Sequence, residues 1–244
     1  MIMNGVGCAI RRAIAVMVLL VLFSHHGFAG DWPQFRGPER DAKSTDEKLL
    51  KKWPDGGPKL LLTMTGLGAG YTQAIVADKV IYVTGAVGDK GFVSALDLDG
   101  KPKWKESYGP VFAGVFRGRY AGARSAPTVS DGKLYVAGSG GQLVCLDAKS
   151  GKRAWSVDFF KTYGVSQPRF GYSESVLVDG KNVLLTTGGD TLMVAFDKDS
   201  GKVVWKSMGI GSHACPNPAA ANGRIYYCPQ INGMMFCFEP VKGN

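Results

Sequence analysis

The chain has 244 residues, of which 45% are hydrophobic and 20% charged, with 34 glycines and a formal net charge of +9. So many glycines without a Gly-X-Y period exclude a collagen-like chain and favour an all-β protein of short strands and tight turns.

Residues 1–29 have the pattern of a secretory signal peptide. Arg11 and Arg12 precede an apolar run, Ala13–Phe23, and a small-x-small site ends at Ala29. The run is shorter than the roughly 20 residues that a spanning helix needs, and a cleavage site follows it. We therefore predict an exported mature chain without a membrane span, located in the periplasm or the cell envelope.

The charge of the mature chain limits its partners. Removal of residues 1–29 takes away Arg11 and Arg12 and lowers the formal net charge from +9 to +7. A basic exported chain can bind acidic ligands, although the charge can also serve solubility alone. The mature chain lacks a basic run, which argues against nucleic acid as a partner. We expect a small polar or acidic ligand, or an envelope protein.

A tandem repeat dominates the mature chain. The stretches "SALDLDGKPKW", "VCLDAKSGKRAW" and "VAFDKDSGKVVW" align with the aspartates spaced by fifty residues, at Asp97, Asp147 and Asp197. Tryptophans keep step at Trp104, Trp155 and Trp205. Units such as "VSDGKLYVAG" precede each stretch and have the apolar alternation and Asp-Gly turn of a hairpin. Four antiparallel strands per repeat of this length indicate a propeller blade.

The repeat predicts the domain boundaries. Residues 30–58 form an N-terminal extension and residues 59–244 a β-propeller. We expect a closing outer strand at 59–65, blades at about 71–108, 124–160 and 172–208, and an incomplete blade at 217–244.

Single repeat positions predict their own environments. The three tryptophans should dock one blade onto the next. Aspartates such as Asp97 and Asp197 should cap their turns rather than bind calcium. Another position holds a small side chain, which we expect to be buried, at Ala95, Cys145, Ala195 and Cys237. The other two mature cysteines, Cys215 and Cys228, could form a disulfide or stay free.

The opening strand raises the question of closure. "PKLLLTMTGLG" aligns with "GKVVWKSMGIG" at a constant offset of 143, so Leu62 stands where Trp205 stands. The chain thus opens with a fourth strand and ends with three strands that lack one. It could be the N-terminal half of a longer product, a closed four-bladed ring of sixteen strands, or one of two chains that lend each other the opening strand.

The repeat also resembles a known family. "DGKLYVAGSGGQLVCLDAKSGKRAW" is similar to the repeat of pyrroloquinoline-quinone (PQQ)-like β-propellers. These include quinoprotein alcohol dehydrogenases and the propeller lipoprotein of outer-membrane assembly. "DWPQFRGPERD" and "PRFGYSESVLVDG" resemble exported PQQ-like repeat proteins of unassigned activity. The resemblance covers nearly all of residues 31–244 and is specific for the fold rather than for the function.

The resemblance leaves two functions open. Quinoprotein dehydrogenases have eight blades, a central PQQ and a calcium ion, and often a vicinal disulfide. This sequence has no adjacent cysteines, no C-x-x-C-H haem motif and no lipoprotein cysteine after its apolar run. Our first hypothesis is therefore a binding or scaffold module, and the alternative is a PQQ-dependent dehydrogenase or a remnant of one. PQQ with calcium is implied by resemblance only.

Two long connections between blades predict a ligand-binding face. Residues 107–123 and 159–172 both follow a tryptophan strand and interleave aromatic residues with arginines, which suits an acidic ligand. The start of each inner strand adds polar residues near the channel. Glu174 and Asn217 could hold a hard cation or merely hydrate the channel. The candidate residues are Tyr71, Arg117, Arg119, Tyr120, Arg124, Arg169, Tyr172, Glu174 and Asn217, and we assign no catalytic residue.

Overall fold

The computed structural model describes residues 30–44, 46, 50–115, 118–188, 190–209, 218–227 and 235–239. The predicted signal peptide lies outside these residues, as do Cys215 and Cys228. Within the described part, no helix combines the length and the apolar character needed to cross a bilayer.

Four antiparallel sheets follow one another along the chain, each with its strands in sequence order. The first blade consists of β1 (Ile75–Ala77), β2 (Val80–Val87), β3 (Lys90–Asp97) and β4 (Pro102–Pro110). The second consists of β5 (Thr128–Ser130), β6 (Lys133–Ala137), β7 (Gln142–Asp147) and β8 (Arg153–Asp158), followed by the short helix α2 (Phe159–Tyr163).

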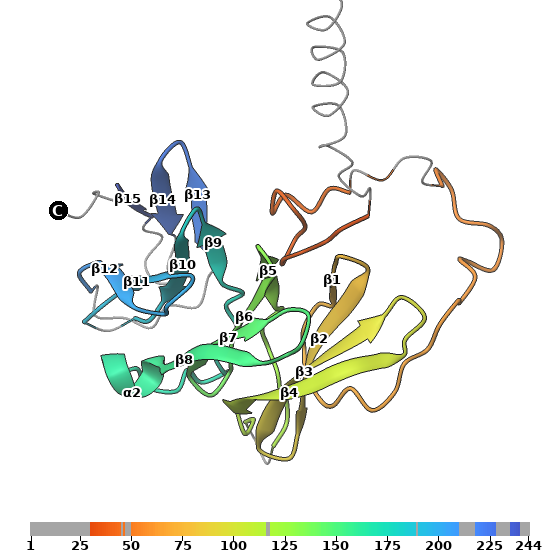
Figure 1. Ribbon diagram of the computed structural model, residues 1–244, viewed down its shortest axis with the longest axis horizontal. Coiled ribbons are helices and arrows are strands. Elements are labelled where there is room, and N and C mark those ends of the chain that lie inside the picture. Colours follow the sequence, from red (N-terminus) through yellow and green to blue (C-terminus); the bar gives the residue numbers. More distant parts are fainter. Residues whose placement is uncertain are drawn as a thin grey trace, which may run out of the picture.

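The third blade consists of β9 (Leu177–Asp179), β10 (Asn182–Thr186), β11 (Met193–Asp197) and β12 (Val203–Lys206). The fourth has three described strands, β13 (Ala219–Ala221), β14 (Arg224–Tyr227) and β15 (Phe236–Phe238). The sheets lie along an arc, with the first strand of each blade on the concave side (Figure 1). The predicted all-β propeller of about four blades is confirmed.

The turn residues explain the first hairpin of two blades. Asp131 and Gly132 both have positive φ, +49° and +72°, and so do Asn222 and Gly223, at +52° and +71°. Positive φ at both central residues defines the type I′ turn, whose twist matches that of the two strands it joins. The Asp-Gly and Asn-Gly pairs therefore set the register of β5 with β6 and of β13 with β14.

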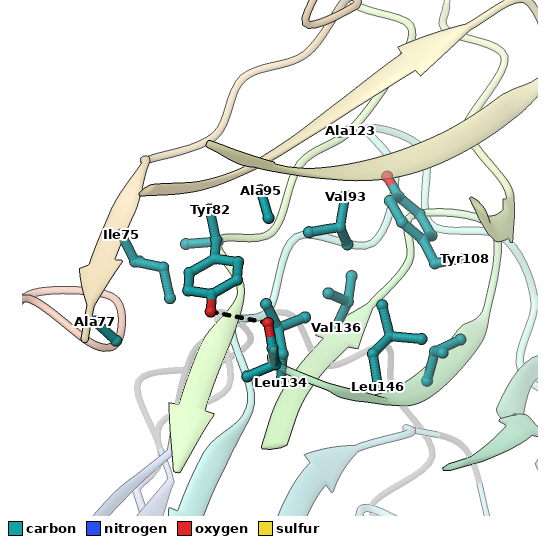
Figure 2. Packing of buried hydrophobic residues seen from close by; sticks show 13 residues of the cluster. Ile75, Ala77, Tyr82, Val93, Ala95, Tyr108, Ala123, Leu134, Val136 and Leu146 are labelled. Atoms are coloured by element: carbon teal, nitrogen blue, oxygen red, sulfur yellow. Dashed lines mark hydrogen bonds between the residues drawn. The ribbon is translucent and has the colours of Figure 1, made fainter. Parts of the chain in front are cut away.

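The core lies between neighbouring blades. Figure 2 shows side chains of the first blade, among them Tyr82 and Val93, facing Leu134 and Val136 of the second. All four are at most 2% exposed. The Tyr82 hydroxyl donates to the backbone carbonyl of Ala148 at 3.0 Å, so its polar end is also satisfied. Each such side chain contributes about 1.5–3 kcal/mol through burial, so stacking of neighbouring blades stabilises the fold.

Tryptophans dock each blade onto the next, as predicted. The indole Nε1 of Trp104 donates to the carbonyl of Ala148 at 3.1 Å, and that of Trp155 to the carbonyl of Lys198 at 3.2 Å. Both acceptors lie in a turn of the following blade. Trp205 packs against the buried cluster of the third and fourth blades.

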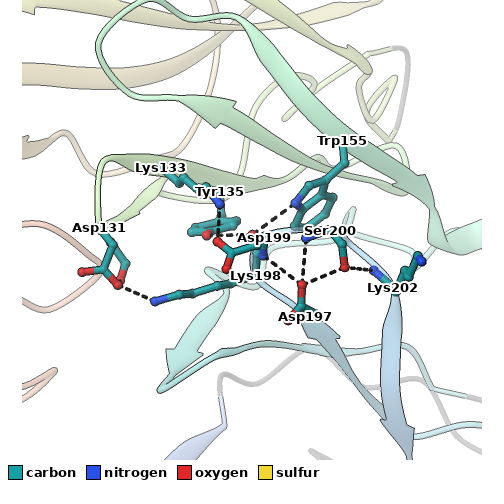
Figure 3. Close-up of polar contacts among 10 residues, drawn as sticks. Asp131, Lys133, Tyr135, Trp155, Asp197, Lys198, Asp199, Ser200 and Lys202 are labelled. Carbon is teal, nitrogen blue, oxygen red and sulfur yellow. Dashed lines mark hydrogen bonds and ion pairs between the residues drawn. The ribbon is translucent and has the colours of Figure 1, made fainter.

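Polar contacts surround the second docking site. Figure 3 shows ion pairs of Lys133 with Asp199 and of Lys198 with Asp131, which join the second and third blades. In the same turn, Asp197 Oδ1 accepts from the backbone N–H of Ser200 at 2.8 Å and from its hydroxyl at 2.7 Å. The prediction that the repeat aspartates cap turns is confirmed at this position.

The column of small residues is buried in the three complete blades. Ala95, Cys145 and Ala195 are all 0% exposed, and each faces the tryptophan of its blade across the outer strand pair. Cys237 is exposed, so the prediction that it is buried is wrong. The reason is that, among the described residues, β15 has no strand on its outer side.

Residues 59–65 belong to no sheet in the described structure. Leu60 is 78% exposed and Leu61 84%. Leu62 and Met64 nevertheless lie against the first blade, because a Cβ added to Gly100 would be 3.2 Å from both side chains. The segment thus occupies the place of an outer strand beside the first blade, and its pairing with the last blade stays a prediction.

Candidate functional site

The N-terminal extension crosses the concave side of the arc (Figure 1). Trp32 forms an antiparallel bridge with Val76 of β1, with hydrogen bonds of 2.7 and 3.1 Å. The N–H of Val129 in β5 donates to the carbonyl of Pro33 at 2.8 Å. The extension is therefore fixed to the first strands of two blades.

Arg40 extends this attachment to the third blade. Its guanidinium donates to the carbonyl of Val176 at 3.1 Å and to that of Ser175 at 3.3 Å. It also donates to Gln34 within the extension at 3.2 Å. These bonds hold residues 31–42 across three successive blades at their inner ends.

A cavity of about 380 Å³ lies under this extension. That volume falls in the range of small-molecule sites. Its lining includes two residues predicted from the sequence, Tyr71 and Arg124. Arg124 is the only charged residue among the described residues of the lining, so the cavity favours a negatively charged group. The polar and aromatic residues around it are Phe35, Thr72, Gln73, Ser173 and Ser175.

Aromatic rings hold Arg124 in position. Its guanidinium carbon lies 5.5 Å from the ring centre of Tyr71 and 5.0 Å from that of Phe112. One Nη atom donates to the carbonyl of Tyr120 at 2.6 Å. Nε is buried and has no hydrogen-bond partner among the described residues. Burial lowers the pKa of Arg124, but an arginine stays protonated in proteins.

The two long connections meet beside this arginine. Ser139 joins them, since its hydroxyl accepts from the N–H of Phe112 at 2.9 Å and donates to the carbonyl of Gly122. Its carbonyl accepts from Gln167 of the second connection at 3.2 Å. Gly171 lies against Arg124, where an added Cβ would be 2.8 Å from the arginine side chain.

The other predicted arginines lie away from the cavity or outside the described residues. Arg119 is exposed, and so is Arg169, whose guanidinium lies 5.3 Å from the ring centre of Phe170. Tyr120 is half-exposed and its ring lies 5.9 Å from that of Tyr71. Arg117 and Asn217 lie outside the described residues.

Tyr172 and Glu174 do not face the channel, contrary to the prediction. Both are 0% exposed, and Tyr172 packs against Phe159 with ring centres 4.8 Å apart. The physical reason is packing, because the Tyr172 ring is buried against Phe159 and Phe160 and Glu174 is hydrogen-bonded to Thr186. Because side chains alternate along an extended chain, Ser173 and Ser175 line the cavity instead.

Glu174 is a buried carboxyl with a complete set of partners. Its oxygens lie 2.7 Å from the Tyr172 hydroxyl and 3.1 and 3.2 Å from the N–H of Thr186, and the Thr186 hydroxyl also contacts it. Burial raises its pKa to about 7, although these hydrogen bonds and the charge of Arg40 oppose the rise. The Tyr172 hydroxyl lies equally close, at 2.7 Å, to the carbonyl of Thr186.

The described residues do not fit a calcium ion. They contain no group of three or more His, Cys, Asp or Glu side chains that could hold a metal. Glu174 is enclosed and already bonded, so its carboxyl is not free to coordinate an ion. A carboxylate of PQQ, by contrast, could pair with Arg124.

Among the lining residues that the sequence analysis did not name as candidates are Phe35, Ser173 and Ser175. Ser173 and Ser175 alternate along the chain with the predicted residues Tyr172 and Glu174. The sequence pattern therefore offered them as well, had the opposite side of the segment been taken to face the channel. Phe35 belongs to the extension, which has no repeat to predict its position.

Comparisons with known proteins agree with this architecture. The family model described as outer membrane protein assembly factor BamB matches residues 56–159 and 89–215, more than half of the chain together. The quinoprotein alcohol dehydrogenase PedH of Pseudomonas putida is 34% identical over 148 residues, which are 56% of this chain and 24% of PedH. BamB of Kangiella koreensis is 29% identical over 174 residues, 70% of this chain and 41% of that protein.

A solved structure shows the same fold. The crystal structure of BamB from Moraxella catarrhalis matches 77% of this chain and 51% of its own, with 19% identity and a TM-score of 0.53. The chain spans less than half the length of the two curated relatives. The chain belongs to the BamB-type family of PQQ-like repeat β-propellers.

Proposed function

We propose that the chain is an exported binding module that holds an acidic group of an envelope protein in the cavity around Arg124. The observation that carries the proposal is the isolated positive charge of Arg124 in a cavity of about 380 Å³, flanked by Tyr71 and Phe112. An arginine fixed between rings loses little freedom when it binds a carboxylate, so recognition is pre-organised. The name of the related BamB proteins, an assembly factor, supports a scaffold role.

The size of the cavity favours a peptide group over a whole folded surface. Thr72, Gln73 and Ser173 offer neutral polar atoms around the arginine, which suits one carboxylate with its neighbouring amides. We therefore expect the carboxy-terminus or an acidic side chain of a partner as the ligand.

Titration calorimetry tests this proposal with two peptides. One peptide ends in an aspartate with a free C-terminal carboxylate. The other ends in an asparagine whose C-terminus is amidated, so it has no negative charge at that end. We expect only the acidic peptide to bind, and Arg124→Gln to weaken that binding at least about tenfold, since a hydrogen bond to a charged group contributes about 1.5–3 kcal/mol. Arg119→Gln, at an exposed neighbour, is the control and should change the affinity less than about threefold. Equal binding of both peptides, or by the Arg124 variant, contradicts the proposal.

The second candidate function is a PQQ-dependent dehydrogenase or a remnant of one. It is favoured by the identity with PedH, a quinoprotein alcohol dehydrogenase. Incubation with PQQ and Ca²⁺, followed by gel filtration, separates the two candidates. Retained quinone absorbance with alcohol-dependent dye reduction favours the enzyme, and loss of the quinone from the protein favours the binding module.

A further inference from the structure

Three exposed aromatic side chains lie around Arg124. Tyr71 is 58% exposed, Tyr120 51% and Phe170 56%. Tyr71 lines the cavity, and its ring centre lies 5.9 Å from that of Tyr120. Phe170 directly precedes Gly171, the residue that lies against Arg124. We call Tyr71, Tyr120 and Phe170 the aromatic rim.

Backbone contacts hold the aromatic rim in place. The carbonyl of Tyr120 accepts from Arg124 at 2.6 Å. Phe170 lies in a turn that is closed by a hydrogen bond of 2.9 Å from the N–H of Gly171 to the carbonyl of Pro168. Aromatic side chains that are positioned in advance lose little conformational freedom when they bind. The rim is therefore a pre-formed contact surface beside the cavity.

The surroundings of the aromatic rim are positively charged. Neither of the two long connections, residues 107–123 and 159–172, contains an aspartate or a glutamate. Arg119 and Arg169 are both exposed, and the guanidinium of Arg169 lies 5.3 Å from the ring centre of Phe170. Guanidinium groups stack on the faces of aromatic rings and pair with carboxylates. These residues together favour a ligand that combines a negative charge with an aromatic group.

The aromatic rim is within reach of a peptide whose acidic group binds Arg124. The guanidinium carbon of Arg124 lies 5.5 Å from the ring centre of Tyr71, which in turn lies 5.9 Å from that of Tyr120. An extended peptide advances about 3.3–3.6 Å per residue. The two tyrosine rings therefore lie within about three residues of the bound acidic group.

We propose that the aromatic rim binds an aromatic side chain of the ligand, located within three residues of the acidic group that pairs with Arg124. The inference rests on the proposed function and adds a specificity to it. The rim offers ring faces and edges to a further ring, and such pairs are more favourable than contact area alone accounts for. Tyrosine and arginine are also the residue types that most often dominate the binding energy of an interface.

Titration calorimetry with a set of acidic peptides tests the specificity. Each peptide ends in an aspartate with a free carboxylate and carries phenylalanine, leucine or serine at one of the three positions before it. At the best position, we expect the phenylalanine peptide to bind at least about fivefold more tightly than the serine peptide. It should bind about threefold more tightly than the leucine peptide, because leucine adds apolar area without a ring.

A double variant locates the preference on the aromatic rim. Tyr120→Ala combined with Phe170→Ala should remove the preference for phenylalanine. It should leave the affinity for the serine peptide within about twofold, since Arg124 keeps its ring contacts with Tyr71 and Phe112. Trp53→Ala is the matched control, because it removes an exposed ring outside the rim and should keep the full preference.

Three results would overturn the inference. Equal binding of the phenylalanine and serine peptides would mean that the rim takes no part, although the proposed function would stand. Equal binding of the phenylalanine and leucine peptides would mean that the rim accepts any apolar side chain. A polyuronate oligosaccharide that binds more tightly than the peptides, and loses affinity in the double variant, would mean that the rim stacks on sugar rings.

The failure of the proposed function has a different signature. If none of the acidic peptides binds, the proposed function fails, and this inference fails with it. The comparison of the peptides on the unmodified protein decides the question even if the double variant does not fold.

Discussion

The ring of Trp155 lies directly on the backbone of Gly201, so close that a Cβ added to the glycine would be 2.6 Å from the indole. The same relationship joins Trp104 and Gly151 one blade earlier. Docking of blades thus depends on two residue types together. A tryptophan ring of one blade packs on a glycine of the next, and a side chain at the glycine position would prevent this contact.

Trp155→Ala should destabilise the protein by about 2–4 kcal/mol, because it removes a large half-buried ring and leaves a cavity between two blades. The free energy of unfolding in urea measures the effect. Trp53→Ala is the control, since Trp53 is 65% exposed and its loss should cost less than about 0.5 kcal/mol. Similar losses for both variants would contradict the docking role.

Gly201→Ala should cost about 2–4 kcal/mol, because it combines a strained backbone at φ +69° with a clash against Trp155. Gly180→Ala separates the two causes. Gly180 has a similar φ of +56° but nothing within 4 Å of the added Cβ, so its variant should lose only about 1 kcal/mol. Urea unfolding of both variants gives the difference, and equal losses would show that the ring contact is unimportant.

Cys145→Ala should be mild, at about 1 kcal/mol or less, because alanine occupies the same repeat position at Ala95 and Ala195. Cys145→Leu should cost more, about 1–3 kcal/mol, since a larger side chain would press on Trp155 across the strand pair. Urea unfolding compares the two. Greater stability for the leucine variant would refute the requirement for a small residue.

Glu174 should make the stability depend on pH. Its pKa in the folded protein is about 7, above the ordinary value of 4.5, so the folded state binds the extra proton between these values. Its contribution is therefore complete below pH 4.5 and is lost as the pH rises through 7, a change on the order of 3 kcal/mol.

Unfolding free energies at pH 5 and pH 8 check this expectation. Glu174→Gln keeps an uncharged side chain at all pH values, so the decrease should be smaller in this variant than in the unmodified protein. Glu39→Gln, at an exposed position, should keep the original profile. A profile that Glu174→Gln leaves unchanged would mean that another group titrates.

The repeat made most of the fold predictable. Fixed spacing places Trp104 and Trp155 at equivalent contacts, and Asp-Gly pairs such as Asp131 and Gly132 specify their own turn. These features are local or periodic, so the structure of one repeat predicts the structure of the next. The channel position of Arg124 also followed from comparison of the copies, and the structure places it in the cavity.

Two features escaped prediction because they are neither local nor periodic. Packing of the Tyr172 ring against Phe159 buries one side of this segment, so Ser175 rather than Glu174 lines the cavity. The contact of Arg40 with Ser175 spans 135 positions in the chain and has no counterpart in another repeat.

That long span has a consequence for the order of folding. Each blade closes through neighbours in sequence, whereas residues 31–42 leave the ribosome before any of the blades they cross. Contacts of large sequence separation bear a high loop-closure entropy and form late. The roof of the cavity around Arg124 is therefore synthesised before the strands that it crosses, and its contacts with Ser175 and Val176 can form only once the start of the third blade has been made.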